Sequence, residues 1–249
     1  MPDSANPRIS VVIPVFNEEG NLAELIRELS QTMNSLRVPY EIICVDDRST
    51  DSSLRVLRGL PERYPLLRVI AHRVNSGESA GEATGFEHAR GGIVITMDAD
   101  LQNDPADIPA MLDALTPDVS AVCGIRRKRE DDFVKRISSR LANRFRNAIT
   151  GETIADAGCT FRALRRSSLR EIIVFNGMHR FIPTILRLQG YKVSELHVNH
   201  RSRASGRSKY GVGNRLWRGI RDCFVMRWYG KRCIPGDRCE PEQIPEGRK

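Results

Sequence analysis

The chain has 249 residues, 40% of them hydrophobic, which is enough for one domain with a buried core. No stretch reaches the roughly 18 to 20 uninterrupted apolar residues of a membrane span, and the opening MPDSANPRIS lacks the basic and apolar regions of a signal peptide, so we expect a cytoplasmic chain. The net charge of +8 suggests an anionic partner, such as nucleic acid, a phospholipid surface or a phosphorylated small molecule.

The first half of the chain alternates short apolar segments with amphipathic ones. Strands are predicted at 9–15, 40–47, 66–72 and 92–97, and helices at 21–36, 52–60 and 79–90. In the first helix Asn21 is a plausible cap, and one apolar stripe comprises Leu22, Leu25, Ile26, Leu29 and Met33. This alternation predicts an α/β fold, Rossmann-like, with a mostly parallel sheet and helices on both faces.

The composition changes near residue 126. Residues 126–146 contain nine basic and three acidic side chains. Apolar residues recur there at every fourth position and predict a helix over 133–149 with a basic opposite face: Phe133, Ile137, Leu141, Phe145 and Ile149. A strand at 159–164, helices at 167–175 and 180–190 and a strand at 191–201 are expected to follow.

The end of the chain is basic. A loop at 201–211, RSRASGRSKYG, precedes a predicted amphipathic helix over 213–232, in which Trp217, Ile220, Phe224 and Trp228 recur at helical spacing among arginines. This helix could lie on a membrane surface or pack as an ordinary core helix. Residues 233–249 are expected to form a disordered tail.

The segment ITMDADLQNDP, residues 95–105, is an apolar run that ends in acids. Asp98 and Asp100 are two residues apart, so an extended chain directs both carboxylates to one side. Two hard oxygen donors suit Mg²⁺ or Mn²⁺, although acids here could instead cap the next helix. Asp104 before Pro105 already predicts the helix start, which favours the metal site for the other two.

A second acidic turn, DDRSTD, follows the strand at 40–47. An acid such as Asp46 or Asp47 at this position typically accepts hydrogen bonds from a ribose or a base edge, while Asp51 is expected to cap the next helix. No GxGxxG motif follows the first strand, which argues against a dinucleotide fold. Glycines spaced by four are expected to let a helix pack closely: Gly77, Gly81 and Gly85.

Several of these motifs together resemble one family. VVIPVFNEEGNL, YEIICVDDRSTDSS, NSGESAGEATGFEHARGGIVITMDADLQNDP, GIRRKR, DAGCTFRAL and RASGRSKYG are similar to those of family 2 glycosyltransferases of GT-A fold, and among them the dolichyl- and polyprenyl-phosphate glycosyltransferases, the group that includes dolichol-phosphate mannose synthase. The resemblance covers 8–212, with a nucleotide-sugar-binding half at 8–125 and an acceptor half at 126–212. It departs at Arg48, where glycine is usual, and at Gly92, where the family commonly has aspartate.

The resemblance implies a nucleotide-sugar donor held with Mg²⁺ or Mn²⁺. Donor-binding positions are Pro14, Phe16, Glu18, Val45, Asp47, Asp98, Ala99 and Gln102, and the metal would be held by Asp98, Asp100 and Gln102. Catalytic roles fall to Asp100, Arg126, Arg203 and Lys209. The acceptor phosphate is expected at Arg126, Lys135, Ser139, Arg140 and Ser208.

The implied reaction moves a hexose, with inversion, from a donor of GDP-mannose or UDP-glucose type to a polyprenyl phosphate. A phosphate monoester is already ionised near neutral pH, its second pKa being about 6, so no strong base is required. The alternative is a family 2 enzyme acting on a hydroxyl, for which Asp156 is either a base or a turn cap. His179 and Arg180 either border the sugar or are structural.

We do not expect nucleic acid as the partner, because aromatic residues are few and the cations lie beside an acidic motif. Many bacterial relatives in the resembled family continue into two transmembrane helices, whereas this chain has the basic amphipathic segment. The expected location is therefore the cytoplasmic face of the membrane, with peripheral attachment.

Overall fold

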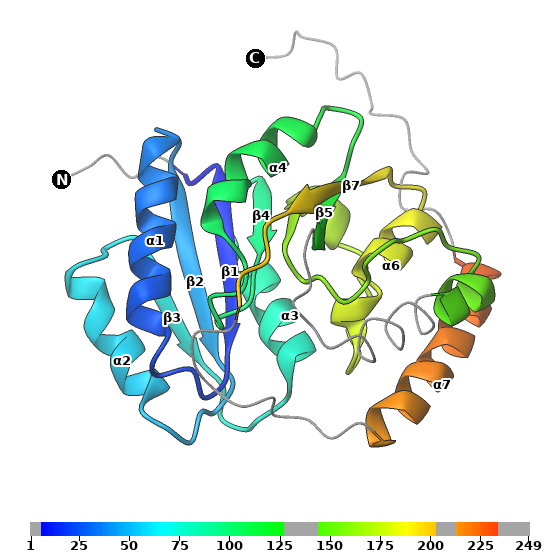
Figure 1. Cartoon of the computed structure of the whole chain (residues 1–249), viewed down its shortest axis with the longest axis horizontal. Coiled ribbons are helices and arrows are strands. Elements are labelled where there is room, and N and C mark those ends of the chain that lie inside the picture. Colours follow the sequence, from blue (N-terminus) through cyan, green and yellow to red (C-terminus); the bar gives the residue numbers. More distant parts are fainter. Residues whose placement is uncertain (1–5, 127–143, 203–212, 234–249) are drawn as a thin grey trace, which may run out of the picture.

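The computed structural model describes residues 6–126, 144–202 and 213–233, with side chains in the last range from residue 219 onward (Figure 1). The strands are β1 (Ile9–Val15), β2 (Tyr40–Asp46), β3 (Leu67–Ala71), β4 (Ile93–Thr96), β5 (Ala121–Arg126), β6 (Arg162–Arg165) and β7 (Val193–Val198). They form one sheet in the order β3-β2-β1-β4-β6-β5-β7. Only the pairings of β6 with β4 and β5 are antiparallel, so the predicted mostly parallel α/β fold is confirmed.

Helices cover both faces of the sheet (Figure 1). The α-helices are α1 (Leu22–Ser35), α2 (Ser53–Gly59), α3 (Glu78–His88), α4 (Ile108–Ala114), α6 (Ile182–Leu188) and α7 (Gly213–Gly230), and residues 144–150 are also helical. Short 3₁₀ helices are η1 (Leu60–Glu62), η2 (Pro105–Asp107), η3 (Arg166–Leu169) and η4 (Met178–Arg180). Helices α1, α2 and α4 pack on one face, and α3, α6 and α7 on the other.

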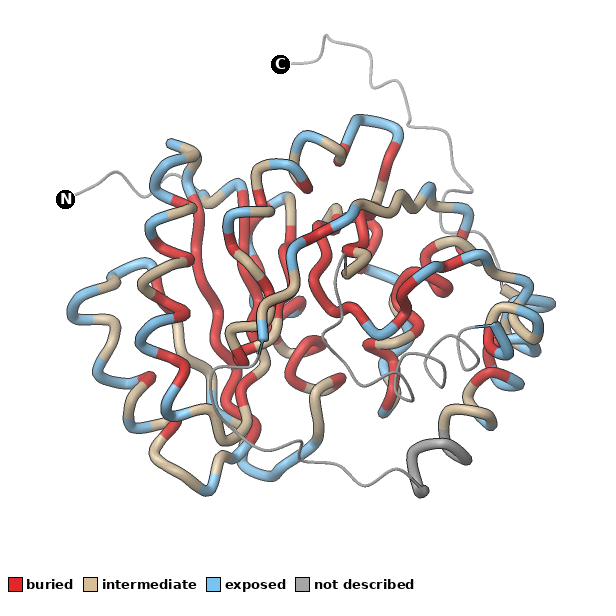
Figure 2. The backbone as a smooth tube through the Cα atoms, in the orientation of Figure 1, coloured by how far each residue is buried: buried red, intermediate tan, exposed pale blue. Residues whose placement is uncertain are grey.

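Each face of the sheet has its own core because side chains along a strand alternate. Val11 and Ile13 pack with α1, whereas Val12 between them packs with α3. The predicted stripe of α1 is buried throughout. Asn21 is the N-cap residue of this helix as predicted, but its side chain donates to Glu18 Oε2 at 2.6 Å and makes no side-chain capping bond. Figure 2 shows the central strands buried along their length.

The close approach of α3 to the sheet is confirmed for two of the three glycines. A Cβ on Gly85 would lie 2.1 Å from Val12 Cγ1, and one on Gly81 would lie 2.9 Å from Pro14 Cβ. Gly77 differs, since a Cβ there would meet nothing within 4 Å, but its φ of +88° is one that L side chains rarely adopt. It turns the chain into α3.

The second half differs from the prediction in detail. The helix expected at 167–175 is reduced to η3, and the turn that follows carries the exposed Val174. Of the helix expected at 133–149, residues 133–143 lie outside the described residues. In its described part Ile149 packs against the core as expected, but Phe145 is 43% exposed and Arg146 only 6% exposed, so the expected apolar stripe is wrong at Phe145. Arg146 faces inward because its Nη1 donates to Arg180 O at 3.3 Å.

None of the helices in the described part of the chain combines the length and apolar character that a membrane crossing requires.

Gly91 and Gly92 offer a matched test of packing ahead of β4. A Cβ on Gly91 would lie 2.7 Å from the backbone of Ile9 and Ser10, whereas one on Gly92 would meet nothing within 4 Å. We expect Gly91→Ala to lower the free energy of unfolding by roughly 1–3 kcal/mol. Gly92→Ala should leave it unchanged or raise it by up to about 1 kcal/mol. Urea unfolding of both variants measures the difference, and equal destabilisation would contradict this packing.

Candidate active site

Three loops meet where the neighbouring strands β1, β2 and β4 end. Asp47 N donates to Val15 O at 2.8 Å, and Thr50 N donates to Asn17 Oδ1 at 2.7 Å, so the first two loops are joined. Each loop holds one non-glycine residue with positive φ: Asn17 at 54°, Arg48 at 61° and Leu101 at 62°. Such residues persist only where the surroundings enforce them, and they concentrate at functional sites. Arg48 thus keeps a conformation that the family's usual glycine would adopt without strain.

Hydrogen bonds within the loop after β4 fix the backbone of Asp98, Ala99 and Asp100. Asp98 N donates to Asn103 Oδ1 at 2.9 Å, and Gln102 N donates to Asp100 Oδ1 at 3.2 Å. Ala99 is buried in the core beside α1. The residue between the two acids therefore anchors the segment, and the loop bonds fix the backbone on which both carboxylates stand. The start of η2 is as predicted, since Ala106 N donates to Asp104 Oδ1 at 3.0 Å.

The two carboxylates repel each other. Burial, and then the charge of Asp100, raise the pKa of Asp98 from 3.8 to about 6, although a hydrogen bond with Thr160 and the charges of Arg162 and Arg126 oppose the shift. A pair of acids held in this way is stabilised by an added cation. The donor set of two carboxylates suits Mg²⁺ or Mn²⁺, which use one or two carboxylates together with substrate phosphates.

Among the described residues no three His, Cys, Asp or Glu side chains gather as a self-sufficient metal site. Two acids plus a diphosphate therefore fit better than a closed protein cage. Gln102, the third expected ligand, uses its amide nitrogen elsewhere: Nε2 donates to Arg201 O at 3.3 Å. Only its Oε1 could serve a cation.

A buried arginine and a buried glutamate lie next to each other near the acids. Arg162 on β6 is fully buried, and its Nη1 is 3.8 Å from Oε1 of Glu82 on α3. None of its guanidinium nitrogens has a hydrogen-bond partner among the described residues. Burial raises the pKa of Glu82 to about 8, with Arg162 opposing the shift. A largely neutral Glu82 leaves the Arg162 charge to act on Asp98, which it favours in the ionised form.

Arg126 and Asp156 form a bidentate pair. Arg126 Nε and Nη2 donate to the two carboxylate oxygens of Asp156, both at 2.7 Å. Burial alone would lower the pKa of Arg126, but the bonds to Asp156 outweigh it and raise that pKa. The sequence left Asp156 as either a base or a turn cap, and the structure adds an ion pair with Arg126 that neither alternative included. Asp156 is the fixed counter-ion of a cation predicted to bind phosphate.

Asp47 has a structural task. Its carboxylate accepts from Ser76 N at 2.8 Å and Gly77 N at 2.7 Å, and it contacts His72 Nδ1 at 2.8 Å. These bonds hold the loop between β3 and α3 against the end of β2. Asp46 is also buried, and its Oδ1 has no partner among the described residues.

The remaining donor positions divide into exposed and buried groups. Pro14 near the end of β1 and Phe16 and Glu18 on the loop after it are partly exposed, whereas the Val45 side chain is fully buried in the same core cluster as residues of α3. Asp51 caps α2 as expected, since its Oδ1 accepts from Ser53 N at 2.9 Å. The following expected site residues lie outside the described residues: Lys135, Ser139, Arg140, Arg203, Ser208 and Lys209.

His179 joins two elements of the molecule. Its Nδ1 is 2.8 Å from Ser79 Oγ on α3, and the same oxygen accepts from Gly177 N at 3.0 Å. Its Nε2 accepts from Arg180 Nε at 3.2 Å. These buried contacts favour the structural alternative for His179.

Sequence reasoning missed Arg162, Glu82 and Arg201. Arg162 was detectable as a charged residue inside an apolar strand, and Glu82 as an acid among the small residues of SAGEATG. Nothing local distinguishes Arg201, whose partners Glu28 and Asp104 come from distant parts of the chain.

Comparison with known proteins agrees with this geometry. The family described as Glycosyl transferase family 2 matches residues 10–173. The undecaprenyl-phosphate 4-deoxy-4-formamido-L-arabinose transferase of Edwardsiella ictaluri is 38% identical over 206 residues, which are 82% of this chain and 63% of that protein. The dodecaprenyl-phosphate galacturonate synthase of Rhizobium johnstonii is 36% identical over 234 residues, 92% of this chain and 69% of that protein. The chain thus spans about two thirds of the length of these relatives.

Solved structures confirm the predicted GT-A fold. A mannosyltransferase of Pyrobaculum calidifontis, in complex with GDP-Man and Mn²⁺, superposes with a TM-score of 0.62 at 23% identity and covers 92% of this chain and 65% of that one. Glucosyl-3-phosphoglycerate synthase of Mycobacterium tuberculosis, in complex with Mn²⁺, UDP and phosphoglyceric acid, has a TM-score of 0.66 at 19% identity, with 93% and 80% covered. At these identities the likeness is one of fold.

The raised pKa of Asp98 predicts a stabilising substitution. An acid whose pKa is higher in the folded state adds stability that is complete below its unfolded value, 3.8, and is lost as the pH rises through about 6. At roughly 1.4 kcal/mol per pH unit, ionised Asp98 costs up to about 3 kcal/mol at pH 8. We expect Asp98→Asn to raise the free energy of unfolding there by about 1–3 kcal/mol without metal, with the gain fading toward pH 4.

Urea unfolding at several pH values in the presence of a chelator measures this gain. Added Mn²⁺ should stabilise the wild type and not the variant. A gain that does not depend on pH would show that Asp98 carries no such electrostatic cost.

Proposed function

Because the chain belongs to glycosyl transferase family 2, we propose that it moves a sugar from a nucleotide sugar to the phosphate of a polyprenyl phosphate. The Arg126–Asp156 pair is the observation that carries this proposal. It holds the candidate base as a counter-ion, and a phosphate acceptor is the one that needs no base. The names of the relatives, which are transferases or synthases of undecaprenyl and dodecaprenyl phosphates, support the same acceptor.

The donor is assigned to the loops after β1, β2 and β4, with the sugar carried on GDP or UDP. Asp98 and Asp100, with Gln102, would hold Mg²⁺ or Mn²⁺, which when bound neutralises charge that grows on the departing diphosphate. The two solved structures of this fold are complexes with Mn²⁺, which supports a divalent ion. The charge of Arg162 opposes the rise in the pKa of Asp98, and Leu101 in the same loop has a φ of 62°.

The acceptor half must bind the anionic acceptor phosphate close to the anionic donor diphosphate. Arg126, fixed by Asp156, presents a positive charge beside the acids, and its charge acts on Asp98. The acceptor oxygen attacks the anomeric carbon from the face opposite the diphosphate, so the configuration inverts. Arg203 and Lys209 are assigned to the diphosphate, and Lys135, Ser139, Arg140 and Ser208 to the acceptor phosphate.

The outer face of α7 is assigned to the membrane surface, where a polyprenyl phosphate would be embedded. Phe224, Val225 and Trp228 are exposed, the last by 60%, while Cys223 and Met226 of the same helix are buried in the core. Arg232 stacks over the Trp228 ring at 5.7 Å. Exposed aromatic side chains flanked by cations suit the interface of an anionic bilayer.

Asp156→Asn separates the phosphate acceptor from a hydroxyl acceptor. Asparagine keeps an acceptor oxygen for Arg126, so we expect less than a tenfold loss of turnover. Removal of a general base would cost about 10²–10⁴. Nucleoside-diphosphate release is followed with Mn²⁺, a panel of GDP and UDP sugars and a short polyprenyl phosphate. Asp98→Asn and Asp100→Asn should abolish release.

A loss of about a hundredfold or more in Asp156→Asn, with the fold intact, would favour the hydroxyl acceptor. Retention of anomeric configuration in the product, seen by nuclear magnetic resonance, would exclude direct displacement.

The membrane assignment is tested by vesicle flotation. We expect Phe224→Ser combined with Trp228→Ser to weaken binding to anionic vesicles at least about tenfold, because each inserted aromatic contributes roughly 1.5–3 kcal/mol. Leu66→Ser is the matched control, since Leu66 is also exposed and precedes β3, at the opposite end of the molecule from α7 (Figure 1). Equal binding of all three proteins would refute this role of α7.

A further inference from the structure

The Asp156 carboxylate that pairs with Arg126 belongs to the loop at 151–158, and a glutamate on β7 holds this loop. Ala155 N donates to Glu195 Oε1 at 2.9 Å. Ala155 immediately precedes Asp156, so this bond fixes the backbone from which the Asp156 side chain projects. A backbone N–H that donates to a carboxylate makes a stronger bond than one that donates to a neutral oxygen.

The sheet determines where Glu195 projects. β5 and β7 are parallel neighbours, with Val198 opposite Arg126 at the end of the pairing. Val193 packs in the same core cluster as residues of α6. Residues two apart on a strand face the same side, so Glu195 also projects toward the α6 side of the sheet. From this position its carboxylate reaches the backbone of Ala155.

Two further side chains hold the first part of the loop. Arg187 on α6 donates from Nη1 to Glu152 Oε2 at 2.9 Å and to Thr153 Oγ1 at 3.3 Å. Asn147 Nδ2 donates to Ile154 O at 2.9 Å. These contacts hold three successive residues, and the β7 glutamate holds the next one, directly before the paired carboxylate.

The orientation of Arg126 depends on the position of this loop for two reasons. Its Nε and Nη2 both donate to Asp156 at 2.7 Å, which requires the two planar groups to be aligned. Its Nη2 also lies against Gly158, where an added Cβ would be 3.0 Å away. The other edge of a guanidinium carries further N–H donors that can bind a phosphate. A shift of the loop would therefore turn those donors as well.

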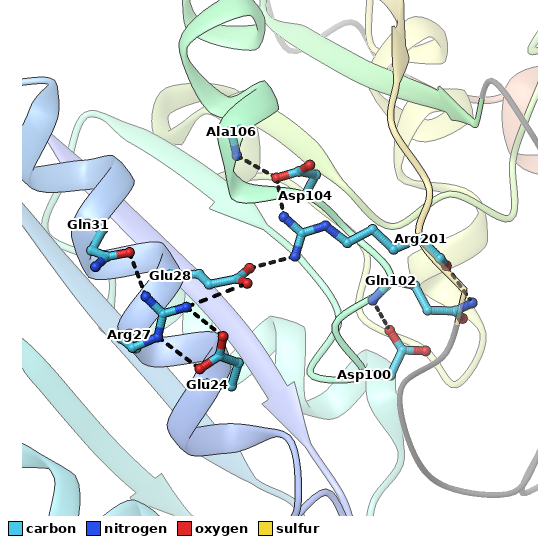
Figure 3. A network of polar contacts seen from close by, with 9 residues as sticks. All are labelled: Glu24, Arg27, Glu28, Gln31, Asp100, Gln102, Asp104, Ala106 and Arg201. Carbon is cyan, nitrogen blue, oxygen red and sulfur yellow. Dashed lines mark hydrogen bonds and ion pairs between the residues drawn. The ribbon is translucent and has the colours of Figure 1, made fainter.

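A different set of contacts holds the loop with the acidic pair. Figure 3 shows the Arg201 guanidinium between Glu28 on α1 and Asp104 at the start of η2. The nine residues drawn there come from α1, from the segment between β4 and α4 and from the chain after β7, and none of them is in the loop at 151–158. A change at Glu195 should therefore leave this donor-side network in place.

We propose that Glu195 is a positioning residue, which holds Asp156 through the backbone of Ala155 and thereby directs the Arg126 guanidinium toward the acceptor phosphate. The proposal rests on the proposed function for the assignment of a phosphate to Arg126. It needs no contact between Glu195 and the substrate. Loss of the bond to Ala155 N should weaken binding of the acceptor and leave binding of the donor nucleotide unchanged.

Glu195→Met and Glu195→Gln form a matched pair at one position. Methionine is similar in length but has no oxygen that could accept from Ala155 N, whereas glutamine keeps one. Asp118→Asn is the control for loss of an acid elsewhere, since Asp118 pairs with Lys192, directly before β7, and with Thr116. All measurements use the full chain.

The first readout is solvent exchange of the Arg126 Nε proton, measured by nuclear magnetic resonance without ligand and assigned by its absence in Arg126→Lys. A proton held by a carboxylate exchanges slowly, and its exchange accelerates when the bond opens more often. We expect exchange at least about threefold faster in Glu195→Met, and changed by less than about 1.5-fold in Glu195→Gln and Asp118→Asn.

The second readout is affinity, measured by calorimetry with farnesyl phosphate as the acceptor probe and with UDP and GDP, each with Mn²⁺, as donor probes. We expect Glu195→Met to weaken binding of farnesyl phosphate roughly fivefold, the effect of about one net hydrogen bond, and Glu195→Gln to weaken it less than about twofold. Nucleotide affinity should change less than about twofold in every variant, because separate contacts hold the donor side.

Gly158→Ala provides a variant with Glu195 intact. The added methyl group would crowd Arg126 Nη2, the flexible end of a side chain, and so should turn the guanidinium at little cost in stability. We expect farnesyl phosphate to bind more weakly to this variant and the nucleotides to bind as to the wild type. Unchanged binding of farnesyl phosphate would contradict the dependence of acceptor affinity on the direction of the guanidinium.

Three further results would overturn the proposal: unchanged Nε proton exchange in Glu195→Met, faster exchange with unchanged affinity for farnesyl phosphate, or equal losses of affinity in Glu195→Met and Glu195→Gln. A wild-type protein that binds UDP or GDP but not farnesyl phosphate would instead refute the proposed acceptor. Exchange of the Arg126 Nε proton would still decide whether Glu195 holds Arg126 in that case.

Discussion

Repulsion between two carboxylates at the end of a buried strand is the constraint around which this molecule is arranged. Burial of Asp98, and then the charge of Asp100, raise the pKa of Asp98 to about 6. The surroundings limit that cost without removing it. Asn103 holds the backbone, Leu101 takes up a strained φ, and Arg162 provides a charge from behind. Without a bound cation, ionised Asp98 still lowers the stability of the fold. A cation with a diphosphate can offset that electrostatic cost.

The two halves of the proposed site differ in how their charges are balanced. On the proposed donor side, burial and the charge of Asp100 raise the pKa of Asp98, and an added cation would relieve that cost. On the proposed acceptor side Arg126 and Asp156 balance each other in a bidentate ion pair. An acceptor that arrives ionised fits such a surface better than one that must lose a proton. The difference between the halves is thus one of charge balance more than of residue type.

Local pattern predicted the parts of the structure that depend on neighbours in sequence. The α1 stripe follows from helical spacing, the start of η2 from Asp104 and Pro105, and the sheet from the alternation of strands and helices. Pairings between distant residues left no such pattern. Arg201 bridges to a helix 173 residues away, Arg126 pairs with Asp156, and Asp47 uses its carboxylate on the loop before α3. Arg146 is buried where Phe145 was expected, because a carbonyl of another element lies within its reach.

The place of β6 in the sheet has a consequence for how such enzymes could diversify. This strand follows the basic region in sequence yet lies between β4 and β5, and Ser79 on α3 bonds to the turn that holds His179. The segments 8–125 and 126–212, which we expect to bind donor and acceptor, are therefore interleaved in one sheet, and replacing either segment with that of a relative would disrupt the sheet. New sugar or lipid preferences would have to arise by substitution in the edge loops, over a framework inherited whole.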